Sequence, residues 1–227
     1  MKDVRRGFWT ALSGLLLGTL LMAVAPVQAA VGVIETTAGE VLQGQLTEEF
    51  IILDNPLVGQ LTLGAGQITR VTVNPGRVEL AGGDVLSGTV KNELIHFTTE
   101  FAAVAIRTDK VKSLAVKDVA VPAGAPGGVE VRLRNGDRVL GALTFDKTIR
   151  PSVGILTDYA GTVNVDLAEI ANIESSGEQY AVTLRDGSRL TGAITNVFFV
   201  LRTAYGELVL PRTAIAGFTF PKAEVKK

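Results

Sequence analysis

One six-residue pattern occurs four times in this 227-residue chain and constrains its fold more than any other feature. The pattern begins with a glycine and ends with a second glycine five positions later, in the copies GEVLQG from Gly39, GDVLSG from Gly83, GDRVLG from Gly136 and GSRLTG from Gly187. Three of the first glycines follow Gly82, Asn135 or Asp186, and such pairs tolerate the positive φ that type I′ hairpin turns require. We therefore predict that each first glycine closes a tight turn between two strands.

The second glycine of each copy predicts a bend in the strand that follows the turn. These glycines are Gly44, Gly88, Gly141 and Gly192. Apolar residues stand two positions to either side of each one, as Leu86 and Val90 do around Gly88. The glycine therefore faces the same side of the strand as they do. A missing side chain on that side allows the strand to curl over a small core.

The apolar pattern around each copy predicts a unit of five short strands. An alternating strand precedes the turn, and two further strands follow the bent one, as in 198–201 and 208–210. Short polar segments such as 107–110 then suit one helical turn before a fifth strand. The spacing recurs with a period of roughly 45 residues. We predict an all-β chain with four tandem five-stranded small-barrel or curved-sheet repeats arranged as two lobes.

Composition shifts divide the chain into five segments. Eight residues, 121–128, hold two prolines and three glycines, which predicts a linker between the lobes. The predicted segments are a signal peptide at 1–29, lobe one at 31–118, the linker at 119–128, lobe two at 129–220 and a charged tail at 221–227.

The first 29 residues are typical of an export signal. Lys2, Arg5 and Arg6 precede an apolar run over 11–25, and small residues around Ala29 suit cleavage after it. Either general secretion or the twin-arginine route fits this segment. If the signal stays uncleaved, its apolar run is the one segment that we expect to contact the membrane. The chain has no cysteine, so an exported form depends on its core alone, which favours a bacterial periplasm or a secreted state.

The stretch VEVRLRNGDRVLGALTFD, residues 129–146, resembles the first motif of the Sm-like group of small SH3-like barrels. The resemblance implies a fold of five short strands with a bent second strand and a one-turn helix. The asparagine and the Arg-Gly motif through which that family contacts RNA have no counterpart here, so it implies nothing about RNA binding. Cleavage after Ala29 would remove three of the 22 basic and one of the 23 acidic residues, leaving a charge of about −3. We therefore expect no nucleic-acid partner.

The residue types needed for familiar catalysis are scarce. His96 is the one histidine, so a zinc site or a Ser-His-Asp triad lacks partners. We expect no catalytic residue, no metal and no cofactor, and enzyme activity through His96 is the least favoured alternative. Glu40, Asp84 and Asp137 follow the hairpin glycines, and we interpret them as solvated turn residues.

Aromatic residues are concentrated in the predicted second lobe. Phe198 and Phe199 must point to opposite faces of one strand. One of the two therefore lies either in the core or on a surface patch, and we expect core filling, because paired units can bury both faces. Three tyrosines could instead line a ligand groove between units three and four: Tyr159, Tyr180 and Tyr205.

The sequence repeats one structural unit and offers no cluster of catalytic residues. This combination favours a non-enzymatic structural or adaptor protein of the cell envelope. Exposed strand edges would bind an envelope protein or further copies of the chain. We predict that the strand containing Val182 is one of these edges. The alternative is a glycan-binding or small-ligand module that uses the three tyrosines.

Overall fold

The protein is all-β in the computed structural model, which describes residues 30–117, 119, 128–144 and 151–221. The predicted signal segment, most of the linker and most of the tail lie outside the described residues. The helices within the described residues are four single 3₁₀ turns. Among these residues, no helix has the length and hydropathy needed to cross a membrane.

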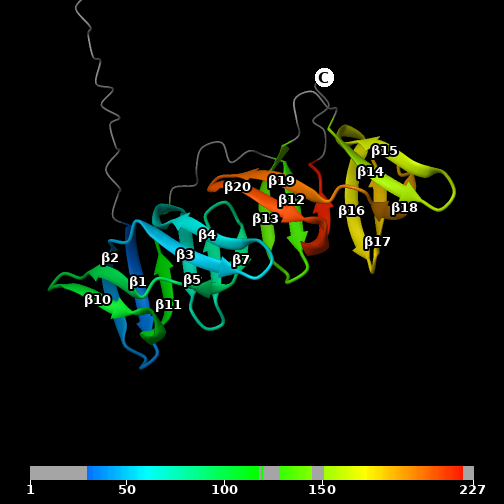
Figure 1. Cartoon of the computed structure of the whole chain (residues 1–227). Coiled ribbons are helices and arrows are strands. Elements are labelled where there is room, and N and C mark those ends of the chain that lie inside the picture. Colours follow the sequence, from blue (N-terminus) through cyan, green and yellow to red (C-terminus); the bar gives the residue numbers. More distant parts are fainter. Residues whose placement is uncertain (1–29, 118, 120–127, 145–150, 222–227) are drawn as a thin grey trace, which may run out of the picture.

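Residues 30–117, called the N-terminal half here, contain eleven strands and two 3₁₀ turns (Figure 1). In chain order these are β1 (Ala30–Thr36), β2 (Val41–Leu46), β3 (Phe50–Asn55), β4 (Gly59–Gly64), η1 (Ala65–Gln67), β5 (Ile68–Thr72), β6 (Arg77–Leu80), β7 (Val85–Ser87), β8 (Thr89–Val90), β9 (Leu94–Thr98), β10 (Ala103–Arg107), η2 (Thr108–Lys110) and β11 (Val111–Val116).

Residues 128–221, called the C-terminal half, contain ten strands and two 3₁₀ turns. These are β12 (Val129–Leu133), β13 (Arg138–Thr144), β14 (Ser152–Thr157), β15 (Gly161–Asp166), η3 (Leu167–Glu169), β16 (Ile170–Ser176), β17 (Gln179–Leu184), β18 (Arg189–Ile194), β19 (Phe198–Thr203), β20 (Gly206–Pro211), η4 (Arg212–Ala214) and β21 (Ile215–Thr219). The strands and helical turns thus form where the apolar periodicity predicts them.

The turns at the first glycines differ in type from the prediction. Each is a three-residue loop, closed for instance by the Gly83 N–H donating to the Leu80 carbonyl at 2.9 Å and the Leu80 N–H to the Asp84 carbonyl at 3.0 Å. The positive φ falls on the glycine, at 92° for Gly83. A type I turn followed by a left-handed glycine produces this geometry, and the pairs that tolerate type I′ also suit it.

Hairpins of the N-terminal half form within the predicted units, and their outer edges pair with strands of the other predicted unit. The β1–β2 hairpin pairs with β11 through β1 and with β9 through β2. In return, β6 pairs with β5 and β8 pairs with β3. Two groups result, which we call group A (β1, β2, β9, β10, β11) and group B (β3 to β8), and they join where β11 pairs with β5.

The C-terminal half repeats this exchange. β12 pairs with β21 and β13 with β19, while β14 pairs with β18 and β16 with β17. The resulting group C (β12, β13, β19, β20, β21) and group D (β14 to β18) join where β16 pairs with β21. β7 and β13 connect B to C through the pair Val85 and Arg138. The four groups lie in a row, A to D (Figure 1).

The second glycine of each copy sits where two exchanged strands come closest. A side chain at Gly192 in β18 would place its Cβ 2.2 Å from the Leu156 carbonyl oxygen in β14. The corresponding distance is 2.2 Å from Gly44 to Thr98, 2.6 Å from Gly88 to Asp54 and 2.5 Å from Gly141 to Arg202. Each glycine therefore admits the backbone of a strand from a different predicted unit.

The core is a continuous set of buried aliphatic side chains with a few aromatic ones. Phe199 and Phe218 meet edge to face with ring centroids 4.9 Å apart. Val182 is fully buried, and its strand β17 pairs with β16 on one side and β18 on the other. The prediction that the Val182 strand is an edge is therefore wrong, because exchange supplies it with a second neighbour.

We predict that Gly192→Ala lowers the free energy of unfolding by about 1–3 kcal/mol, because the added methyl group meets backbone that cannot swing away. Urea unfolding followed by circular dichroism measures the change. Gly66→Ala is the matched control, since a Cβ at Gly66 meets nothing within 4 Å. Equal midpoints for the two variants would contradict the role assigned to the close approach.

Candidate functional site

The structure does not bring the three tyrosines of the predicted groove together. Tyr159 lies in the turn between β14 and β15 and is 73% exposed. Tyr180 is buried in β17, where its hydroxyl donates to the Arg212 carbonyl at 3.0 Å. Tyr205 lies in the turn between β19 and β20, with its hydroxyl buried.

Tyr205 belongs to the junction between groups B and C, where two hairpin turns bind each other reciprocally. The Leu140 N–H donates to Asp84 Oδ1 at 2.7 Å. In the opposite direction, the Ser87 N–H donates to Asp137 Oδ1 at 2.8 Å. Leu140 stands three residues after Asp137, and Ser87 three after Asp84. The junction therefore has approximate twofold symmetry around the pair Val85 and Arg138.

The two junction aspartates are buried, so their interpretation as solvated turn residues is wrong. Asp137 is 1% exposed, and its Oδ2 accepts from Asn55 Nδ2 at 2.7 Å and from Asn135 Nδ2 at 2.8 Å. Burial raises the pKa of Asp84. Burial also raises the pKa of Tyr205, as does the negative charge of Asp84 beside it. Sequence reasoning missed this cluster because each turn alone shows one carboxylate, and burial comes from the other half of the chain.

Five strands of the described residues pair on one side only: β4 and the two-residue β8 in group B, and β10, β15 and β20 in groups A, D and C. In β20, Leu208 and Leu210 are buried. The Arg212 N–H donates to the Val197 carbonyl at 3.0 Å and fixes the register with β19. The backbone groups of Glu207 and Val209 therefore point away from β19, because bonding direction alternates along a strand. Pro211, at the next outward position, has no N–H to offer.

The β19–β20 hairpin also carries the most apolar outward face among the four hairpins that contain β4, β10, β15 or β20. We call this the β20 surface: the side chains of Phe198, Val200 and Val209 together with the unpaired edge of β20. Phe198 is 58% and Val209 59% exposed. The expectation that Phe198 fills a core is wrong, because no second sheet covers this face within the described residues.

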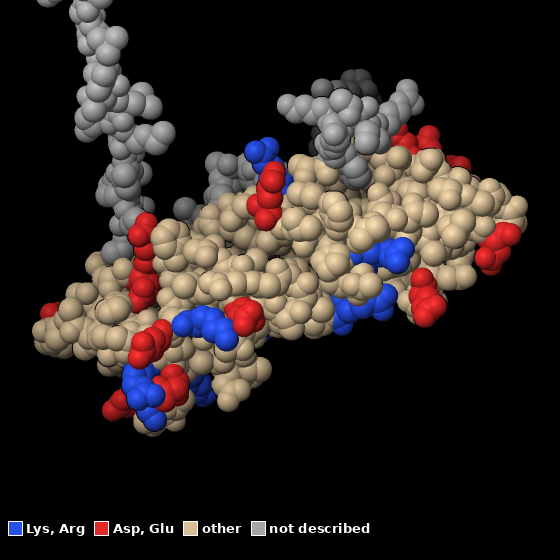
Figure 2. Space-filling view, in the orientation of Figure 1, with Lys and Arg blue, Asp and Glu red and all other residues tan. Residues whose placement is uncertain are grey.

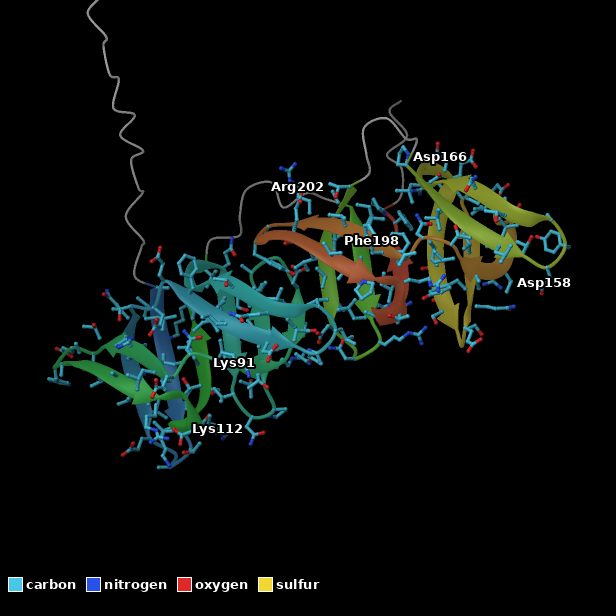
Figure 3. All side chains as sticks on the ribbon, in the orientation of Figure 1. Lys91, Lys112, Asp158, Asp166, Phe198 and Arg202 are labelled. Carbon is cyan, nitrogen blue, oxygen red and sulfur yellow. The ribbon has the colours of Figure 1, made fainter. Side chains whose placement is uncertain are left out.

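The other outward faces carry more polar side chains, such as Gln60 and Thr62 on β4 or Thr162 and Asn164 on β15. Phe198 and Arg202 mark the two ends of β19 in Figure 3. Figure 2 shows that charged side chains are sparse over the middle of the same face of the molecule.

A pocket of about 620 Å³ opens in the C-terminal half. Its lining includes Tyr180, Glu178 and two arginines, Arg134 from the turn after β12 and Arg212 from η4. Arg134 Nη2 donates to Ser175 Oγ at 2.9 Å, and Arg212 Nη1 donates to the Ile194 carbonyl. Within the described residues neither guanidinium forms an ion pair. Tyr159 and Tyr205 do not line this pocket.

His96 lies on the outer face of β9. Its Nδ1 is 2.6 Å from Glu48 Oε1, and its side chain is half exposed. Across the described residues, no three His, Cys, Asp or Glu side chains gather as metal ligands would.

Comparisons of the chain with known protein families, with characterised proteins and with solved structures found no significant match.

We predict that Asp137→Ala lowers the free energy of unfolding by about 3 kcal/mol, because three donors that meet its carboxylate lose their acceptor. Glu40→Ala is the control, since Glu40 holds the equivalent position in the first copy and is exposed. Chemical denaturation of both variants tests this, and a loss below about 0.5 kcal/mol for Asp137→Ala would be that of an ordinary surface residue.

Proposed function

We propose that the protein is an exported, non-enzymatic adaptor or structural protein of a bacterial cell envelope that binds an extended protein segment along the β20 surface. The observation that carries this proposal is the coincidence of an unpaired strand edge with exposed Phe198 and Val209. The export pattern of residues 1–29 supports the location.

The proposed architecture is four five-stranded units in two lobes, with the units of each lobe exchanging strands. Equivalent 3₁₀ turns before β5, β11, β16 and β21 support the repeat. So does the recurrent strand order within groups A and C, where β10-β9-β2-β1-β11 matches β20-β19-β13-β12-β21. The short strands and bent second strand are similar to Sm-like and SH3-like small barrels, and this similarity concerns the fold alone.

Strand addition at β20 would combine two sources of affinity. The outward N–H and C=O groups of Glu207 and Val209 would pair with a partner backbone, and alternate side chains of the partner would pack beside Val209 and extend the apolar face of Phe198 and Val200. Pro211 limits the pairing at one end, because it offers an acceptor without a donor. The proposed partner segment is therefore short and extended, with apolar residues at alternate positions.

We expect Val209→Pro to abolish this partner binding while leaving the fold intact. The substitution removes an N–H that points away from β19 and places a ring where the partner strand would lie. Crosslinking of tagged protein in cells, followed by mass spectrometry, compares the wild type with the variant.

Asn164→Pro on β15 is the matched control, because Asn164 has the same register in its hairpin as Val209. Its crosslinks should match those of the wild type. Partners retained by a folded Val209→Pro protein would overturn the proposal.

A second candidate function is binding of a small acidic or glycan ligand in the pocket that holds Arg134 and Arg212. Two guanidinium groups that line the pocket favour this function, because neither has an ionic partner among the described residues. Titration calorimetry with acidic cell-wall fragments tests it, and Arg134→Ala should weaken any binding at least tenfold. Fragments that bind the wild type and Arg134→Ala equally would exclude this site.

A further inference from the structure

The outer ends of the row of groups display the same turns that form the junction between B and C. Group A ends in the β1–β2 turn and the β9–β10 turn, which we call the A end. Group D ends in the β17–β18 turn and the β14–β15 turn, which we call the D end. The β9–β10 and β14–β15 turns lie at opposite extremes of the molecule (Figure 1).

The backbone of the end turns matches that of the junction turns. In the first kind of turn, the glycine N–H donates to the carbonyl three residues earlier at 3.0 Å for Gly39 and 3.1 Å for Gly187, against 2.9 Å for Gly83 and 3.0 Å for Gly136. The glycine φ is 87° and 89° at the ends, against 92° and 89° at the junction.

The second kind of turn shares one feature at all four places, although two residues separate the closing pair in groups A and C and three in groups B and D. The side-chain oxygen of the residue that opens it accepts a backbone N–H from within the turn, in the pairs Asn55 and Leu57, Thr99 and Phe101, Thr157 and Ala160, and Thr203 and Tyr205. Two residues after each opening residue stands a large side chain: Leu57, Phe101, Tyr159 or Tyr205. The junction and both ends thus share the backbone of the glycine turn and present a large side chain from the second turn beside it.

The side chains make the two ends different from each other and complementary. The D end resembles the C side of the junction, with Arg189 in place of Arg138 and Tyr159 in place of Tyr205. The A end resembles the B side, with an acidic residue, a valine and a large apolar residue as in group B: Glu40, Val41 and Phe101 in place of Asp84, Val85 and Leu57.

These end residues are exposed where their junction equivalents are covered. Val41 is 60% exposed against 9% for Val85. Phe101 is 90% and Tyr159 73% exposed, whereas Leu57 and Tyr205 pack against the core. Each end therefore keeps uncovered the apolar surface that the chain buries at its own centre.

We propose that the D end of one copy docks on the A end of a second copy and repeats the B–C junction between chains. Val41 then pairs with Arg189 of the next copy as Val85 pairs with Arg138. The Thr191 N–H donates to the Glu40 carboxylate, as the Leu140 N–H does to Asp84, and the Gln43 N–H donates to the Ser188 hydroxyl. This interaction goes beyond the proposed function and does not depend on the β20 surface.

Because the two ends differ, the contact is head to tail and leaves an unused end on each copy, so it extends into linear chains. It is weaker than the internal junction for two reasons. Ser188 supplies a hydroxyl where Asp137 supplies a carboxylate. Separate copies also lack the high effective concentration that connection in one chain gives the internal contact. We expect association that grows with protein concentration.

Disulfide trapping tests the register, since the natural chain has no cysteine. Mixing Val41→Cys protein with Arg189→Cys protein under mild oxidation should give a crosslinked heterodimer, and the variant with both substitutions should give a ladder. The variant with Val85→Cys and Arg138→Cys is the positive control, since the same pair there should close within one chain. Homodimers of Val41→Cys alone at the same yield would overturn the head-to-tail assignment.

A second test uses Phe101→Asp and Tyr159→Asp, two substitutions at exposed positions. In sedimentation velocity each variant alone should remain monomeric at concentrations where the wild type associates, while an equimolar mixture should form dimers and nothing larger. Val209→Pro should associate like the wild type, which separates this contact from the β20 surface. A wild type that stays monomeric up to about 1 mM, the effective concentration of a short tether, or a Phe101→Asp variant that associates like the wild type, would refute the proposal.

Discussion

One hairpin opens each half of the chain, and the need of these two hairpins for hydrogen-bond partners controls the rest of this structure. The β1–β2 hairpin has two outer edges, and both are satisfied by strands from residues 94–116 rather than by the strands that follow it directly. The same holds for β12 and β13, which pair with β21 and β19. Buried backbone groups need partners, so neither hairpin forms a complete sheet without the later stretch. The second glycines make this exchange possible, because a side chain there would overlap the incoming backbone.

The junction between the halves shows how a polar cluster can hold two sheet groups together. Asp84 and Asp137 each accept a backbone N–H from the opposite turn, and Asp137 also accepts from Asn55. A buried carboxylate without such donors would cost several kcal/mol in desolvation. The arrangement therefore fixes the alignment of the two turns more strictly than apolar contact alone, since displacement would leave both the acceptors and the donors unpaired.

Much of the local structure follows from the sequence, whereas the partners of each strand do not. Alternation such as Val131 and Leu133 locates the strands because the inward face repeats every second residue. The same alternation carries no information about which strand lies alongside, so the exchange was missed and the strand of Val182 was misplaced at an edge. For the same reason Asp84 and Asp137 were interpreted as solvated. Their cover comes from residues fifty or more positions away in the chain. Phe198 was assigned to a core because the sequence does not show whether a second sheet lies over its face.

The exchange of strands also sets the order in which the chain can acquire its structure. Gly32 pairs with Val116, so residues 30–72 hold two unfinished sheet fragments until nearly all of the N-terminal half is present. Contacts at such separations form slowly. A chain that emerges from a ribosome one residue at a time thus lacks the partners of its first strands until almost an entire half has emerged. Both groups of a half therefore depend on strands from its last stretch to become complete.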